Sequence, residues 1–247
     1  MKATAFEFRL RVAIMVIVIF LGFWAPWIEL WGIGSRIPLL DWLPLQLSRL
    51  GLLSFSAAVP VVIVLVALTA AKAAALRIWG PAYLGPATVN NFQMKASAVL
   101  ADGPYRYVRN PLYLGSWGVM AAIAFLMPPT GALFVMILLT VFLLRLIFAE
   151  EAFLTNQLGE PYRAYLHSVP RLIPRLRTTL PSTGRKPHWL RAAIAEINPI
   201  GIFLIFAIFS WSYNNRLMVR AVLISFGISL VVRALLPAIS QSASPAE

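Results

Sequence analysis

The sequence predicts an all-α membrane protein, a polytopic bundle of about six transmembrane helices. The first observation is composition: 60% of the 247 residues are hydrophobic and only 12% are charged, whereas about a quarter of the residues in soluble domains are charged. The second is that the apolar residues fall into six runs separated by polar segments. Because the backbone has no water to bond inside a bilayer, each span is expected to be a helix.

The first 90 residues are predicted to hold two of these helices. The apolar run 12–31 reads as a retained span rather than a signal peptide, because it is long and ends in three tryptophans. A connector follows at 32–50, and its amphipathic piece LLDWLPLQL is expected to lie in the membrane interface. The second span is predicted over 52–76, with Pro60 as a kink inside it.

A core segment is predicted over 91–178, after a polar stretch that starts at Arg77. Two apolar runs, 113–127 and 132–149, are separated by Pro-Pro-Thr-Gly, which is a turn signal and predicts a helical hairpin. The second helix is expected to continue past Glu150 with one apolar face, interrupted around Gly159.

The remaining residues, 179–247, are predicted to form a basic linker and a last transmembrane pair. The pair covers 197–213 and 217–236 and is joined by a short polar turn. Proline-rich, basic sequence before the pair is expected to run extended along the surface, and the last eight residues are expected to be disordered.

The basic residues orient the bundle. With the N-terminus in the cytoplasm, 17 of the 21 lysines and arginines fall on the inside, which fits the excess of positive charge on cytoplasmic loops. Both termini are then expected in the cytoplasm, in a multi-pass protein of the bacterial inner membrane. The net charge of +12 is explained by topology and anionic lipid contacts, so no nucleic-acid partner is expected.

The composition also excludes several chemistries. The chain has no cysteine, which excludes disulfides, a thiolate nucleophile, iron–sulfur clusters and thiolate zinc sites. The two histidines, His167 and His188, are too few and too far apart in sequence to indicate a metal cluster. No metal is therefore expected.

Two polar clusters stand out against this apolar background. GPYRYVRNPLYLG, residues 103–115, leads into the helical hairpin and carries two arginines and three tyrosines. Pro111 suits the first turn of a helix, where free N–H groups favour an anion. Glu150 and Glu151 form the second cluster, on the same predicted side of the membrane. These residues could equally be interfacial anchors that pair with one another.

From Asn91 to Pro174 the sequence resembles the isoprenylcysteine carboxyl methyltransferase and phospholipid methyltransferase family. The resemblance rests on GPYRYVRNPLYLG, the hairpin, and the segment EEAFLTNQLGEPYRAYLHSVPRLIP, which follow one another with the family's spacing. It implies an integral membrane enzyme that uses S-adenosylmethionine without a Rossmann fold. The cofactor pocket would face the cytoplasm and be closed by a short helix at the end of the core. The methyl acceptor would be a lipid or another lipophilic small molecule.

The resemblance also implies site residues. Cofactor contacts carry over to the first polar cluster and to Glu150, and by position alone to the stretch that precedes the cluster. Arg109 and Glu151, which adjoin these contacts, are included in the expected cofactor site. The expected cofactor-binding set is Ser97, Ala98, Val99, Leu100, Tyr105, Arg109, Asn110, Pro111, Leu112, Tyr113, Glu150 and Glu151.

The sequence departs from the family pattern at two positions. Asn110 replaces the family's histidine, and because an amide cannot titrate, a general base there is excluded. Leu146 replaces the family's substrate-binding arginine, and the nearest arginine is Arg145, about 100° away around a helix. Arg145 and Glu150 are the expected catalytic residues.

Two alternatives remain open at this stage. One is an NADPH-dependent membrane reductase of the sterol-reductase type, which the spacing between the two clusters disfavours. The other is a non-catalytic transport or assembly protein, for which charged residues in mid-span would be expected. The sequence leaves the acceptor atom, the role of the last two helices and the oligomeric state open.

Overall fold

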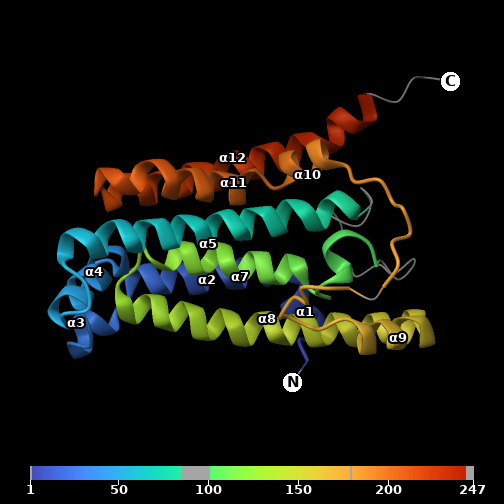
Figure 1. The fold of residues 1–247 in the computed structure, drawn as a ribbon, viewed down its shortest axis with the longest axis horizontal. Coiled ribbons are helices and arrows are strands. Elements are labelled where there is room, and N and C mark those ends of the chain that lie inside the picture. The colour runs from blue at the N-terminus through green and yellow to red at the C-terminus, as the bar shows by residue number, and fades with distance from the viewer. Residues whose placement is uncertain (1, 85–100, 179, 243–247) are drawn as a thin grey trace.

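The computed structural model describes residues 2–84, 101–178 and 180–242, and within them the regular structure is entirely helical. The all-α fold class is therefore confirmed. Each of the six apolar runs forms helix, and the long helices lie side by side along the longest axis of the molecule (Figure 1).

Helix length limits how many spans can be counted. In the described residues three helices are long and apolar enough to cross a membrane: α5 (Phe55–Tyr83), α8 (Pro129–Leu158) and the part Asn215–Val232 of α12 (Asn215–Ser242). A bent pair, Trp189–Ala195 with Ile197–Ser212, makes a fourth if it is one span. The predicted number of about six therefore stays a prediction.

Two apolar helices are short. The helices α2 (Arg11–Trp24) and α7 (Pro111–Ala124) have 14 residues each, or about 21 Å at 1.5 Å per residue, against a hydrocarbon thickness of about 30 Å. The predicted run 12–31 is broken because Ala25 adopts a left-handed conformation (φ +40°) before Pro26. The chain restarts as α3 (Trp27–Trp31).

The connector forms a helix, α4 (Leu39–Arg49), at the end of the bundle away from α9 (Figure 1). Its first two N–H groups donate to the carbonyls of Met127 and Phe125, at 2.8 Å each. These carbonyls lie at the turn between α7 and α8, so their unpaired acceptors and the unpaired donors of α4 satisfy one another. The connector is thereby fixed to the hairpin.

Helix α5 extends further than the sequence predicted. The predicted end near Leu76 is wrong, because the helix continues through Arg77, Gly80 and Pro81 to Tyr83. Arg77 does not end the helix because its charge is met inside the bundle, by Glu196 at 2.6 Å and Ser116 at 3.1 Å.

Helices α5 and α7 pack closely through small residues. A Cβ placed on Gly118 would lie 2.9 Å from the Cβ of Ala73, and one on Gly115 would lie 2.9 Å from Cγ of Arg77. Only glycine permits these approaches without a shift of the neighbouring atoms. The contact holds the start of α7 against the C-terminal half of α5.

The second helix of the hairpin, α8, continues past Glu150 as predicted. Helix α8 ends at Gly159 (φ +62°), and α9 (Glu160–Ser168) follows with Pro161 in its first turn. One face of α9 buries Tyr162 and Tyr165. This confirms the predicted helix with an interruption around Gly159.

The C-terminal pair lies along α5 (Figure 1). It consists of α10 (Trp189–Ala195), α11 (Ile197–Leu204), a π-helical turn (Ile205–Phe209), a 3₁₀ turn (Ser210–Ser212) and α12. The carboxylate of Glu196, at the bend between α10 and α11, binds the guanidinium of Arg77 at 2.6 and 2.8 Å.

We expect the pair between Arg77 and Glu196 to matter for stability, because the side chains are only 19% and 2% exposed. Removing one partner leaves a buried charge, which costs about 3–5 kcal/mol. Arg77→Met should therefore lower the midpoint of thermal unfolding in detergent by many degrees. The matched control is Arg163→Met, whose pair with Glu160 is 59% and 79% exposed and is worth about 1 kcal/mol or less. Equal midpoints for the two variants would contradict this reading.

Candidate active site

The two predicted polar clusters meet at one end of the bundle, where α7 begins and α8 approaches its end. The hydroxyl of Tyr113 donates to the carboxylate of Glu150 at 2.8 Å. The side-chain amide of Asn110 donates to Glu151 at 3.1 Å. These pairs are 37 and 41 residues apart in sequence, so the hairpin between α7 and α8 is what joins them.

The geometry of the first cluster follows from how α7 starts. Asn110 is the N-cap residue and Pro111 occupies the first turn, where its missing N–H costs nothing. Tyr113 therefore sits in the first turn, on the side that faces α8 and Glu150.

Glu151 is the centre of a buried ionic network. Its side chain is 7% exposed and accepts hydrogen bonds from Nε and Nη2 of Arg171, at 3.0 and 2.8 Å. Arg109 lies 3.5 Å away on the other carboxylate oxygen. The guanidinium of Arg171 also stacks over the ring of Phe148, 4.7 Å from its centroid. Both oxygens of Glu151 are thus engaged within the chain.

The chain after α9 folds back over the first cluster. The N–H of Arg109 donates to the carbonyl of Pro170 at 2.9 Å, and the amide of Asn110 donates to the carbonyl of Arg171 at 3.2 Å. The N–H of Arg175 donates to the carbonyl of Tyr107 at 3.0 Å. These contacts hold residues 170–175 across the entry to α7.

Helix α9 covers the same region through its buried tyrosines. The hydroxyl of Tyr165 donates to the carbonyl of Tyr105 at 2.8 Å. Tyr105 belongs to a short 3₁₀ helix, Gly103–Arg106, that precedes α7. The short helix at the end of the core therefore does pack on the first cluster.

A buried aspartate binds residues 182 and 183. Asp102 is buried, and its carboxylate accepts from the hydroxyl of Ser182 at 2.7 Å, the N–H of Thr183 at 2.9 Å and the hydroxyl of Thr183. Burial by itself raises the pKa of Asp102, but the hydrogen bonds from Thr183 and Ser182 outweigh it, so the pKa lies below its ordinary value.

Two buried donors in the cluster have no hydrogen-bond partner within the described parts of the chain. They are the hydroxyl of Tyr105 and Nε of Arg109. Burial, and then the charge of Glu150, raise the pKa of Tyr105 well above its ordinary value, so the phenol keeps its proton. Because unpaired buried donors cost free energy, each of the two is a point at which a ligand could accept a hydrogen bond.

A glycine of α5 packs against the first polar cluster. A Cβ on Gly80 of α5 would lie 2.7 Å from Cδ2 of Leu112 and 3.4 Å from the hydroxyl of Tyr105. Gly80 thus lets Leu112 and Tyr105, two of the predicted cofactor residues, pack closely against α5.

Arg145 forms an ion pair with Glu7, away from the two polar clusters. Its guanidinium pairs with Glu7 at 2.8 and 2.9 Å, and its carbonyl accepts from the N–H of Ala3. The hydrogen bond from Arg145 lowers the pKa of Glu7 to about 2. Arg145 and Glu150 are five residues apart on α8, about 140° around the helix. The structure thus gives Arg145 a partner on α1 (Ala5–Arg9).

Leu146, at the position of the family's arginine, is fully buried and packs with Phe8 of α1. The predicted residues Ser97, Ala98, Val99 and Leu100 lie outside the described residues. Among the described side chains, no three His, Asp or Glu residues come together in a way that could hold a metal ion.

Sequence reasoning missed several residues of the site. Arg171 was only one of many basic residues in a proline-rich stretch, and Asp102, Gly80 and Glu7 carried no local signal. The one available hint was the Val-Pro pair at 169–170, because Pro170 is the residue that the backbone of Arg109 contacts.

An apolar helical bundle with buried polar groups at one end defines the class of this molecule, which is an integral membrane protein. Residues 53–161 match the family model described as phospholipid methyltransferase. The match spans α5 to the start of α9 and includes both polar clusters, and it confirms the resemblance found in the sequence. The match covers 109 of the 247 residues. No curated protein and no solved structure is significantly similar to the chain.

We expect Asp102→Asn to release residues 182 and 183, because an asparagine side chain carries no charge and has one acceptor oxygen fewer. Trypsin should then cut faster at Arg177, Arg185 and Lys186. The same release is expected in the unmodified protein at low pH. Since the pKa of Asp102 is depressed in the fold, its contribution is complete above its ordinary value of 3.8 and is lost as the pH falls through the lower folded value.

Asp41→Asn is the matched control for this digestion, because Asp41 lies in α4 at the other end of the bundle. Equal cutting rates at those three residues in both variants would show that Asp102 does not hold the segment.

Proposed function

We propose that this chain is an S-adenosylmethionine-dependent integral membrane methyltransferase with a lipid or other lipophilic acceptor. The observation that carries the proposal is the meeting of the two clusters: Tyr113 with Glu150 at 2.8 Å and Asn110 with Glu151 at 3.1 Å, both inside the segment that matches the family.

The described residues fit such a cofactor. The unpaired hydroxyl of Tyr105 and the unpaired Nε of Arg109 are donors for a carboxylate or hydroxyl group. The carboxylate of Glu150 is an acceptor for an ammonium or a ribose diol. It accepts a hydrogen bond from Tyr113 and lies near the charge of Arg11, and a carboxylate can accept further hydrogen bonds. Tyrosine rings beside the site offer faces for a sulfonium.

When bound, S-adenosylmethionine supplies a methyl group that its sulfonium already activates. The protein then contributes orientation and exclusion of water. In this proposal Tyr105, Arg109, Pro111, Leu112, Tyr113 and Glu150 hold the cofactor. Asn110 orients by hydrogen bonding and removes no proton, because an amide does not titrate in this range.

Glu151 has a supporting part in the proposal. Its oxygens bind Arg171, Arg109 and Asn110, so it positions the two motif residues rather than contacting the cofactor itself. Residues 170–175 and α9, which cover the cluster, keep water from it.

Arg145 is proposed as a substrate contact only after its pair with Glu7 opens. The two side chains are 28% and 25% exposed, so exchange with an anionic acceptor group from the bilayer is sterically open. Glu150 is the member of the predicted catalytic pair that stands next to the proposed cofactor.

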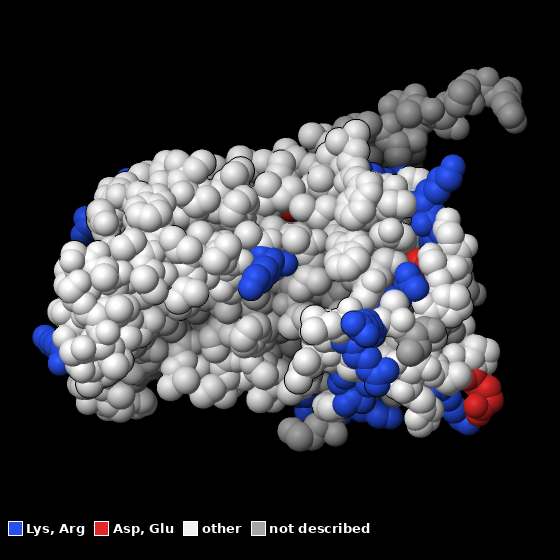
Figure 2. Space-filling model, in the orientation of Figure 1, with Lys and Arg blue, Asp and Glu red and all other residues white. Residues whose placement is uncertain are grey.

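The proposed orientation places this end of the bundle in the cytoplasm, together with both termini. Lysines and arginines gather at the end of the molecule near α9 in the face shown in Figure 2. This agrees with the excess of basic residues on cytoplasmic loops.

The orientation can be tested directly because the chain has no cysteine. A single Arg163→Cys, on α9, should react with an impermeant maleimide only after spheroplasts are opened. Arg49→Cys, at the other end of the bundle, should react with intact spheroplasts. The reverse pattern would contradict the orientation without affecting the proposed chemistry.

The cofactor proposal is tested by calorimetry with S-adenosylmethionine and the protein in detergent. We expect micromolar binding by the wild type and a loss of at least about tenfold in Glu150→Ala, because a charge-assisted hydrogen bond is worth about 1.5–3 kcal/mol. Glu160→Ala is the control, since this acid is 79% exposed on α9. Absence of binding by wild-type protein that still unfolds cooperatively would contradict the proposal.

A further inference from the structure

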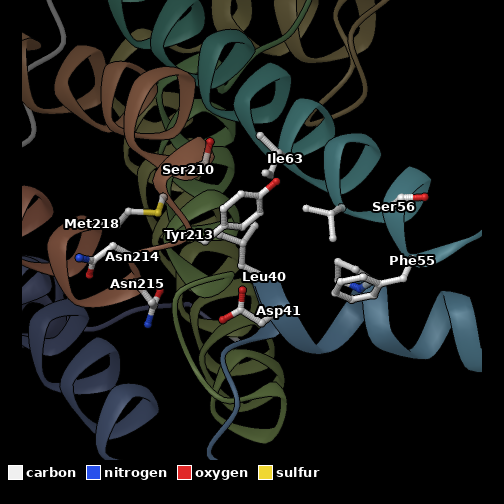
Figure 3. Close-up of a pocket in the computed structure, with 12 residues that line it drawn as sticks. Leu40, Asp41, Phe55, Ser56, Ile63, Ser210, Tyr213, Asn214, Asn215 and Met218 are labelled. Carbon is white, nitrogen blue, oxygen red and sulfur yellow. The ribbon is translucent and has the colours of Figure 1, made fainter.

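A pocket of about 330 Å³ lies at the end of the bundle opposite the candidate active site, between α4, the start of α5 and the start of α12 (Figure 3). Ile63, which lines it, and Gly80, which lines the candidate site, are 17 residues apart on α5, or about 25 Å. The pocket is therefore a separate site, and nothing about methyl transfer accounts for it.

The lining combines one acid with aromatic rings and apolar walls. Asp41 supplies a carboxylate from α4, and Phe55 and Tyr213 supply rings. In the view of Figure 3 the ring of Tyr213 lies between the two asparagines at the start of α12 and Phe55. Leu40, Val59 and Ile63 are apolar parts of the wall.

Two acceptors in this pocket lack a donor among the described residues. The buried Oδ1 of Asn215 has no hydrogen-bond partner there, although its amide nitrogen reaches the carbonyl of Leu126 at 3.4 Å. Asp41 forms no salt bridge with any described cation. Its apolar surroundings raise the pKa of its carboxyl, the direction expected for an acid without a cation beside it.

The backbone of Tyr213 is held in an unusual conformation. Its φ is +52°, in the left-handed region that non-glycine residues seldom occupy. This conformation ends the 3₁₀ turn Ser210–Ser212, for which Tyr213 is the C-cap residue. It places the tyrosine at the pocket, at the turn between the last two apolar segments.

We propose that this pocket binds the primary ammonium group of an organic amine. The carboxylate and the unpaired amide oxygen both accept hydrogen bonds, and a primary ammonium has three N–H donors to give them. The aromatic face also attracts the positive charge of an ammonium. An anion would be repelled by Asp41. A quaternary ammonium has no donor and would leave Oδ1 of Asn215 unpaired.

An amine of this kind could be a lipid headgroup or a soluble molecule. Exposed apolar side chains near the pocket, Leu52, Phe55 and Trp211, provide a surface for acyl chains. The shared chemistry is the ammonium group, and the two sources can be separated by experiment.

The experiment is a thermal-shift titration of the purified full-length protein in a neutral detergent. The probes are phosphatidylethanolamine, phosphatidylcholine with the same acyl chains, and ethanolamine. We expect the primary amine to raise the unfolding midpoint. Asp41→Asn should weaken its apparent affinity at least about tenfold. Glu29→Gln, an exposed acid at the same end, is the control and should bind like the wild type.

The outcomes are distinct. A shift with phosphatidylethanolamine alone supports a lipid headgroup, and a shift with ethanolamine as well supports a soluble amine. Tyr213→Leu provides a second variant, in case Asp41→Asn does not fold, and should also weaken the shift. The proposal is overturned if no amine gives a shift, if phosphatidylcholine matches phosphatidylethanolamine, or if both pocket variants respond like the wild type. These results are independent of S-adenosylmethionine binding.

Discussion

The constraint on which the rest of this structure depends is that a charge inside an apolar helical bundle must be paired. Glu151, 7% exposed, binds two arginines, and Glu196, 2% exposed, binds Arg77 through both oxygens. An unpaired charge in such surroundings would cost several kcal/mol. The arginines and glutamates of these pairs come from different parts of the chain, so pairing also fixes which helices are neighbours.

This constraint gives the adjacent acids different roles. Glu151 is held by Arg109 and Arg171, and through them it ties the chain after α9 to the start of α7. Glu150 is rotated by about 100° from it on the same helix and meets the hydroxyl of Tyr113. One acid is thus used for the fold, and the other retains capacity for a ligand.

The sequence predicted features that depend on nearby residues. Apolar runs predicted the long helices, Pro111 predicted the start of α7, and Gly159 predicted the end of α8. Features that depend on distant residues were missed: Arg77 and Glu196 are 119 residues apart, and Arg145 and Glu7 are 138 apart. Residue periodicity carries no information on such pairs. Residue periodicity also did not predict that the first apolar run is broken at Ala25 and Pro26.

The central claim is that the paired clusters form a methyl-transfer site, and the most direct test is transfer of a labelled methyl group. Purified protein would be incubated with S-adenosylmethionine labelled at the methyl group and with total membrane lipid, and the extracted lipid would be counted. We predict label in the lipid with wild type and Glu160→Ala, and none above background with Glu150→Ala. Equal labelling by wild type and Glu150→Ala would contradict the account.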